Sequence, residues 1–166
     1  MTETNPQASA NVNYKGIPYY QSQLNQFIQT FSQAVNNIFK SGYVSDAKTE
    51  DAANKGIALF VVGDNSKTLT ASTVSVNSEL LKDANKLATK TTVSEGEGSA
   101  SIMDKLNALQ KERLFDGGTG SYFLETIVSD MSIDASKAKT FVTNYNNMKT
   151  TIQLSLIHIS EPTRPY

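Results

Sequence analysis

The sequence predicts a mainly helical α+β fold: an elongated helical bundle with two long heptad helices, shorter helices and a small β-hairpin. Apolar residues recur in heptad steps near both ends of the 166-residue chain. Between these ends, one short segment alternates apolar and polar residues around a turn signal. The length suits one domain, or one domain with a small appendage.

The first long helix is expected to begin near Pro18 and to end at Gly42. Proline suits the first helical turn, where its missing N–H costs nothing, and glycine commonly follows the last turn. Apolar residues step by 4, 3, 4, 3 and 4, at Tyr20, Leu24, Phe27, Phe31, Ala34 and Ile38. The stripe is wider on one side, which indicates a second neighbour for the helix. The residues that widen it, our candidate subunit contacts, are Ile28, Val35 and Phe39.

Shorter elements are expected to follow. Residues 43–56 resemble a loop, and two strands, 57–62 and 68–76, form a hairpin that must lie against a helix because two strands alone are marginally stable. A helix over 78–90 would be capped by Asn77 or Ser78, with an apolar face of Leu80, Leu81, Ala84 and Leu87. A flexible connector, residues 91–100, comes next.

Two more short helices are expected before the last one. Ser101 and Asp104 give a weak capping-box signal for a helix over 101–113, whose face is Ile102, Leu106 and Leu109. After a turn over 114–121, Ser121 can cap a helix over 122–131.

The second long helix is expected to begin at Asp134, with Ile133 and Ala138 as a hydrophobic staple. Its seam steps by 3, 4, 3 and 4, at Ala138, Phe141, Tyr145, Met148 and Ile152. Each seam is too narrow to be stable alone, so the two long helices should lie side by side, with Phe31 against Phe141 or Tyr145. The residues predicted to pack between helices are Leu24, Phe27, Phe31, Ile38, Phe141, Tyr145, Met148 and Ile152.

The two ends of the chain are excluded from this bundle. Residues 1–16 are polar and aperiodic and are expected to be extended or disordered. The segment LSLIHISEPTRPY, residues 154–166, resembles the in-frame translation of a sequencing-library adapter. A native strand-like tail is the alternative. Residues 154–166 are therefore interpreted as an artefactual tail, and the native protein is expected to continue past Gln153.

Composition argues against an enzyme. Residues 1–153 contain neither histidine nor cysteine, which removes the commonest general base, metal ligand and strong nucleophile. A net charge of −1 offers no basic footprint for nucleic acid or an anionic membrane. No apolar run approaches the ~20 residues that span a bilayer, and the N-terminus lacks the apolar segment of a cleavable signal. We predict no catalytic residues, no cofactor and no metal site.

Three local patterns that could suggest a catalytic or binding site have simpler explanations. The carboxylate pairs Glu50–Asp51 and Glu95–Glu97 lie in polar loops, where solvated charges are expected. The segment 64–66 lacks the acidic alternation of a calcium loop and suits a hairpin turn. Three glycines, Gly117, Gly118 and Gly120, lack the Lys-Ser/Thr of a phosphate loop, so a tight interhelical turn is expected.

Several segments together resemble the flagellar hook-associated protein 1 (FlgK) family. The first long helix carries the family's pattern through Ile17, Pro18, Leu24, Asn25, Thr30, Phe31, Ala34 and Asn36, followed by Gly42 and Tyr43. GIALF resembles its short strand ending in Phe. Further matches, in the same order, are Asp83 and Ala88; Leu106, Leu109, Phe115 and Gly117; and Asp134, Ala135 and Ala138. The family's N-terminal helix and its C-terminal continuation have no counterpart, so the chain is expected to be a fragment cut at both ends.

The resemblance implies a structural subunit at the hook–filament junction, without catalysis. It implies export through the flagellar type III apparatus, an extracellular location and a role in motility. The implied partners are further copies in a ring or helical array, the hook protein and the second junction protein. Residues 17–153 would be the partial helical rod domain. Alternatives are another flagellar axial protein, such as the second junction protein or a flagellin, and an unrelated secreted coiled-coil interaction protein.

Overall fold

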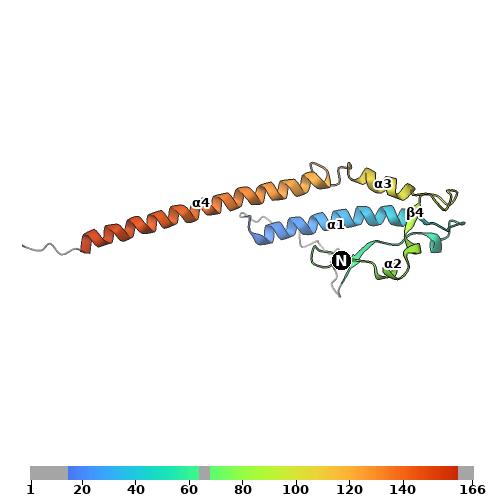
Figure 1. Ribbon diagram of the computed structural model, residues 1–166, viewed down its shortest axis with the longest axis horizontal. Helices are drawn as coiled ribbons and strands as arrows, with labels where there is room; N and C mark the ends of the chain where they lie inside the picture. The colour runs from blue at the N-terminus through green and yellow to red at the C-terminus, as the bar shows by residue number, and fades with distance from the viewer. Residues whose placement is uncertain (1–14, 64–67, 161–166) are drawn as a thin grey trace, which may run out of the picture. The chain divides into compact units, whose positions relative to one another are not determined.

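The computed structural model describes residues 15–63 and 68–160, and side chains up to Ile157. The turn expected at 64–66 lies outside these residues, as does most of the lead expected over 1–16. Contacts divide the chain into two units, Met1–Ile127 and Val128–Tyr166. Figure 1 shows the elements of both units. Mainly helical α+β architecture is confirmed, whereas the pairing of two long helices in a bundle stays a prediction.

The first long helix has the predicted bounds. α1 (Ile17–Ser41) begins with Pro18 in its first turn, and its C-terminal residue is followed by Gly42, whose N–H donates to the Phe39 carbonyl at 3.2 Å. Gly42 has a negative φ of −96°, so the backbone conformation does not demand glycine. Glycine is needed here for lack of space, because a Cβ at residue 42 would lie 2.5 Å from Cδ1 of Ile102.

The predicted hairpin is confirmed, with shorter strands. β2 (Phe60–Val62) pairs with antiparallel β3 (Val74–Val76), in a register that places Phe60 opposite Val76. Thr70 and Thr73 form a turn before β3, in which the Thr73 N–H donates to the Thr70 carbonyl at 3.2 Å. Residues 57–59 and 68–73 were predicted as strand but make no ladder.

A second small sheet was not predicted. β1 (Tyr43–Val44) pairs with antiparallel β4 (Ala88–Lys90), with Tyr43 opposite Lys90 and Val44 opposite Ala88. The segment expected to be a loop, 43–56, therefore contains a strand and the 3₁₀ turn η2 (Ala52–Asn54). Strands of two and three residues leave no alternation to detect, and their pairing joins segments more than 40 residues apart.

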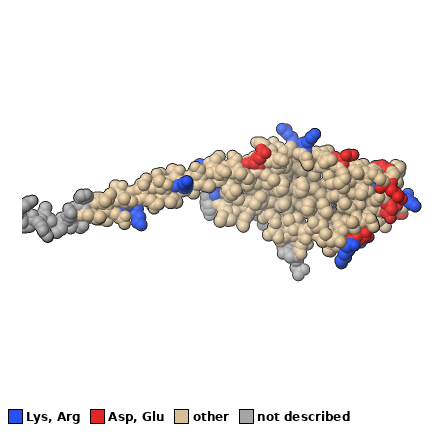
Figure 2. All heavy atoms as spheres, in the orientation of Figure 1, with Lys and Arg blue, Asp and Glu red and all other residues tan. Residues whose placement is uncertain are grey.

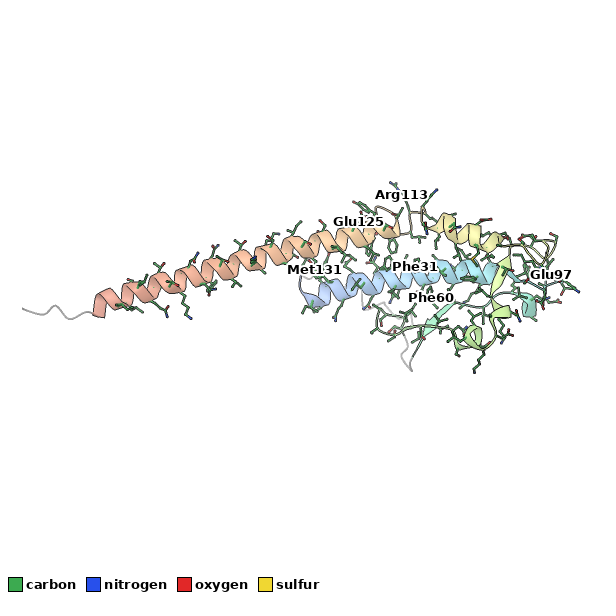
Figure 3. All side chains as sticks on the ribbon, viewed as in Figure 1. Phe31, Phe60, Glu97, Arg113, Glu125 and Met131 are labelled. Atoms are coloured by element: carbon green, nitrogen blue, oxygen red, sulfur yellow. The ribbon has the colours of Figure 1, made fainter. Side chains whose placement is uncertain are left out.

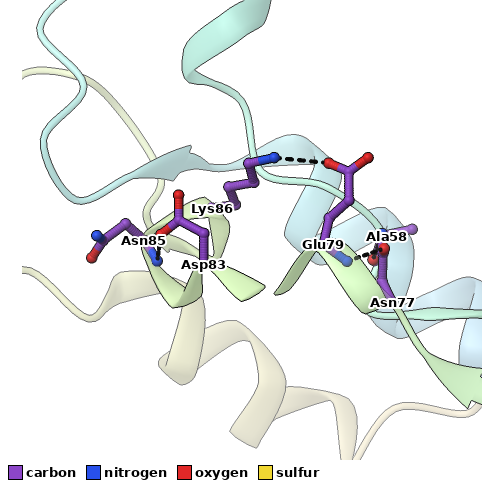
Figure 4. Close-up of polar contacts among 6 residues, drawn as sticks. All are labelled: Ala58, Asn77, Glu79, Asp83, Asn85 and Lys86. Carbon is purple, nitrogen blue, oxygen red and sulfur yellow. Dashed lines mark hydrogen bonds and ion pairs between the residues drawn. The ribbon is translucent and has the colours of Figure 1, made fainter. Parts of the chain in front are cut away.

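The helix predicted over 78–90 is wrong beyond its first turn. α2 (Ser78–Lys82) is capped by Asn77, whose side-chain oxygen accepts from the Glu79 N–H at 3.0 Å. The chain then leaves the helix at Asp83, forms the 3₁₀ turn η3 (Ala84–Lys86) and enters β4. Figure 4 shows the ion pair that braces this turn, Lys86 to Glu79 at 2.9 Å. The predicted apolar face does not exist, because Leu80 is buried and Leu81 is exposed.

The next helix keeps its predicted face but not its predicted cap. α3 (Ser101–Leu109) buries Ile102 and Leu109, with Leu106 packed against them. Ala100 occupies the cap position without a side-chain hydrogen bond, and the Ser101 hydroxyl donates to Glu95 instead. The helix packs against α1. The core between them contains Val35, Phe39, Ala88, Ile102 and Leu109.

One continuous helix replaces the two that were predicted near the C-terminus. α4 (Gly120–Ser160) runs through Asp134, which is therefore an interior residue and not an N-cap. The sequence has no glycine or proline between Gly120 and Pro162 that would break the helix. Thr119, not Ser121, lies at its start, where the Thr119 hydroxyl accepts from the Tyr122 N–H at 3.4 Å.

Candidate functional site

An aromatic cluster in the first unit gathers residues from four segments. Phe27 on α1 stacks on Phe31, with ring centroids 5.7 Å apart, and on Phe115, at 5.3 Å. Phe115 stacks on Phe123 at the start of α4, at 4.7 Å. Phe31 in turn meets Phe60 of β2 at 6.1 Å, as Figure 3 shows. The cluster therefore fastens both the hairpin and the α3–α4 turn to the face of α1 that carries Phe27 and Phe31.

An apolar groove of about 740 Å³ opens beside this cluster. One row of α1 side chains lines it, Leu59 and Phe60 form one wall, and α3 with the first turns of α4 forms the other. Its lining residues are Phe27, Phe31, Val35, Phe39, Leu59, Phe60, Leu106, Leu109, Gln110, Lys111, Leu114, Gly120, Ser121 and Leu124. The volume and the mostly apolar lining are typical of sites that bind another apolar group.

Polar side chains on α1 position the hairpin wall of the groove. Asn36 donates its amide N–H to the Phe60 carbonyl at 2.8 Å and accepts from the Phe60 N–H at 2.9 Å. Gln29 donates to the Leu69 carbonyl at 2.9 Å, and the Asn25 oxygen accepts from the Ala71 N–H at 2.9 Å. Because these bonds satisfy backbone groups outside the β2–β3 ladder, they replace the third strand that the hairpin lacks.

The predicted packing residues on α1 are found in different places. Phe27 and Phe31 belong to the aromatic cluster, and Ile38 packs against the core. Leu24 is 40% exposed and faces a small pocket with Thr70, Ala71 and Ser72. Three of these four residues therefore pack inside the first unit.

The predicted subunit contacts on α1 need a correction. Val35 and Phe39 are 5% and 3% exposed and belong to the core, so they do not form an outer contact surface. Ile28 is half-buried. The wide apolar stripe of α1 exists because α3 and the hairpin both cover this helix within one chain.

The seam of α4, defined as Phe141, Tyr145, Met148 and Ile152, is uncovered. These side chains are 68%, 74%, 60% and 53% exposed. The helix between Thr140 and Met148 contains no charged residue, and few charged side chains appear along this unit on the face shown in Figure 2. Such a contiguous apolar stripe is typical of an interaction surface. Pairing of this seam with α1 stays a prediction.

The tail residues do not differ from the seam in exposure. Leu154, Leu156 and Ile157 are 56%, 59% and 57% exposed and continue α4. These three side chains therefore lie largely in water. Because the residues before Gln153 are equally exposed, burial does not separate tail from native helix, and the adapter assignment continues to rest on the sequence.

A compact polar cluster closes the loop after β4. One Glu95 carboxylate oxygen accepts from the backbone N–H groups of Thr91 and Thr92, at 3.1 and 3.0 Å. The other oxygen accepts from the hydroxyls of Ser99 and Ser101, at 2.5 and 2.6 Å. These hydrogen bonds, Ser101 first and Ser99 next, lower the pKa of Glu95 from 4.5 to about 2.

A buried lysine lies beside this cluster. Lys90 is 2% exposed and its ammonium donates to the backbone carbonyls of Ala47 at 2.9 Å and Glu95 at 3.3 Å. With both Glu95 oxygens occupied by the chain's own donors, the cluster has the hydrogen bonding of a structural loop closure. The interpretation of Glu95 as a solvated charge was therefore wrong, because five donors of the loop, the Thr92 hydroxyl among them, converge on its carboxylate. The sequence does not reveal this convergence.

The glycine-rich segment forms a turn, and the Glu50–Asp51 pair lies on the surface. Gly117 has a positive φ of 99°, and Phe115 and Gly118 exchange backbone hydrogen bonds at 3.2 and 3.0 Å, so the predicted interhelical turn is confirmed. Glu50 and Asp51 are exposed, and Asp51 accepts from the Thr49 hydroxyl at 2.6 Å. Within residues 15–63 and 68–157, no three Asp or Glu side chains gather as a metal site would require.

Comparison with protein-family models, curated proteins and solved structures found no match. No helix in the described part of the chain combines the length and the apolar composition needed to cross a membrane.

Proposed function

We propose that the chain is a structural subunit that assembles through helix packing, at the hook–filament junction of a bacterial flagellum. The observation that carries the assembly role is the α4 seam. Four large apolar side chains at 3 and 4-residue spacing are more than half exposed, and the stretch that holds three of them has no charge. Such a seam is stable in water once another helix covers it.

The flagellar assignment comes from the order of the family-like segments. Two of the matching residues make contacts that this fold needs, which supports the assignment. Asn36 binds the edge of the hairpin, and Phe115 belongs to the aromatic cluster beside the interhelical turn. The partners follow from the resemblance: further copies in a ring or helical array, the hook protein and the second junction protein. Type III export, an extracellular location and the absence of catalysis belong to the same proposal.

Binding to purified axial proteins tests this function. The immobilised chain should retain hook protein and the second junction protein from a flagellated bacterium, and F141E/Y145E should not, because two carboxylates cannot be buried unpaired. The double variant T143E/T150E adds the same charge at exposed positions on the opposite face of α4 and should bind normally. Equal binding by all three proteins, or by none, contradicts the proposal.

Sequencing of the adjoining DNA separates the flagellar proposal from its rivals. The upstream reading frame should encode the family's Asn-x-Asn-Thr-x-Gly-Tyr helix, with flagellar genes nearby. Another axial protein would show a different start motif, and an unrelated coiled-coil protein would have no flagellar neighbours.

A further inference from the structure

The groove of the first unit has the length of a short helical segment. Its α1 row runs from Phe27 to Phe39, twelve residues along the helix, or ~18 Å at 1.5 Å per residue. Val35 and Phe39 are buried at its base, whereas the walls carry half-buried side chains such as Leu59, Phe60 and Leu106. The groove therefore offers a strip of apolar wall rather than a closed cavity.

The seam of the second unit matches this strip in length and chemistry. Phe141 and Ile152 are eleven residues apart on α4, or ~16 Å along its axis. Residues 140–148, which hold three of the four seam side chains, carry no charge, so burying these three against apolar walls leaves no unpaired ion. Lys111 at the rim of the groove is exposed, so its ammonium can remain in water.

We propose that the α4 seam of one copy docks in the groove of a second copy. This proposal rests on the proposed function, in which the seam is an assembly surface. It adds that the groove is the surface that covers the seam. Every copy has both a seam and a groove, and in the single chain the groove is open and the seam is exposed. Because the two surfaces differ, the contact is heterologous, and repetition gives a ring or an open array.

The area that the seam and the groove can bury together indicates a weak contact. An aromatic side chain buries roughly 150–250 Å², and Met and Ile bury less, so two aromatic and two aliphatic seam side chains that are more than half exposed contribute ~400 Å². An equal area of groove gives ~800 Å² in total, which is the range of weak specific contacts. The association should therefore depend on concentration and should increase when many copies are aligned.

Charged substitutions can block each surface separately without entering the core. F141E/Y145E blocks the seam at exposed positions. Q110E/S121E places two carboxylates in the groove from exposed positions, and glutamate near the start of α4 is compatible with the helix dipole. Matched controls are T143E/T150E on the opposite face of the seam helix, and N107E/T126E at exposed positions that do not line the groove.

Sedimentation velocity over a concentration series tests the proposal with the full chain. The wild type and both controls should self-associate, and each blocked variant alone should be monomeric. An equimolar mixture of the two blocked variants should restore association, stopping at a 1:1 dimer, because only one intact seam and one intact groove remain per pair. Circular dichroism and urea midpoints of the variants check that each remains folded.

Each other outcome overturns the proposal in a recognisable way. If Q110E/S121E associates like the wild type, the seam pairs with another seam, and the groove is not its partner. If the wild type is monomeric at every concentration, a second copy is not the occupant. The axial-protein binding experiment is independent, so binding of hook protein by a monomeric chain would preserve the proposed function and reject this inference.

Discussion

Asn36 and Phe60 exchange two hydrogen bonds, in which a side-chain amide of α1 takes the place of a neighbouring strand. The Asn36 amide donates to the Phe60 carbonyl at 2.8 Å, and its oxygen accepts from the Phe60 N–H at 2.9 Å. The same β2 residue contributes its ring to the aromatic cluster through Phe31. One residue pair thus sets both the edge of the hairpin and the wall of the groove.

Replacing Asn36 with alanine should destabilise the protein. Both backbone groups of Phe60 would lose their partner in a partly buried position, which typically costs about 1–3 kcal/mol. Asn37→Ala is the matched control, because Asn37 is the adjacent residue on the same helix and is exposed. Urea unfolding followed by circular dichroism measures both. Equal midpoints for the two variants would show that the Asn36 bonds contribute nothing.

Replacing Gly56 with alanine should also destabilise the fold. An added Cβ would lie 2.5 Å from the Phe39 carbonyl oxygen and 2.5 Å from Cβ of Ala88, and the backbone atom cannot move aside cheaply. Overpacking of this kind costs about 1–3 kcal/mol. Gly96→Ala is the control, since nothing lies within 4 Å of the added Cβ, and its urea midpoint should be unchanged or slightly higher.

The Glu95 cluster should make stability depend on pH in acid. Hydrogen bonds from Ser101 and Ser99 lower the pKa of Glu95 to about 2, from 4.5. A lowered carboxylate pKa stabilises the folded state above the unfolded pKa, and this stabilisation is lost as pH falls from 4.5 towards 2. Glu95→Gln should therefore be less stable than wild type at neutral pH, and the difference should shrink through that window.

The measurement for Glu95 is a set of urea midpoints between pH 7 and pH 2. Glu97→Gln, which removes an exposed carboxylate from the same loop, should keep the wild-type pH profile. Glu79, whose pKa is lowered by its hydrogen bond and charge interaction with Lys86, is present in all three proteins and cancels in the comparison. Parallel curves for Glu95→Gln and wild type would contradict the prediction.

Deleting residues 154–166 should leave stability nearly unchanged. Leu154, Leu156 and Ile157 are more than half exposed, so their loss removes little buried area. Surface changes of this kind stay within ~0.5 kcal/mol. Urea midpoints of residues 1–153 and 1–166 provide the comparison. Greater stability of the longer form by more than ~1.5 kcal/mol would mean that the tail packs specifically and is native.

The sequence by itself determined the features that depend on neighbours along the chain. Pro18 fixes the start of α1 through local backbone chemistry, and the 3.6-residue period predicts the face of α3 that buries Ile102. Alternation around a turn likewise predicts the hairpin, which the structure confirms as β2 and β3. The heptad spacing of the α4 seam is visible in the sequence, although its exposure is not.

Only the tertiary structure decided what depends on residues far apart in the chain. The pairing of Tyr43 with Lys90 turns a predicted loop and a predicted helix into strands, because hydrogen bonds to a distant partner outweigh weak local propensity. The hydroxyls of Ser99 and Ser101 both donate to Glu95, so a carboxylate that the sequence places on the surface holds the loop together. The groove exists for the same reason: its walls come from three segments of the chain, and no local period records where they meet.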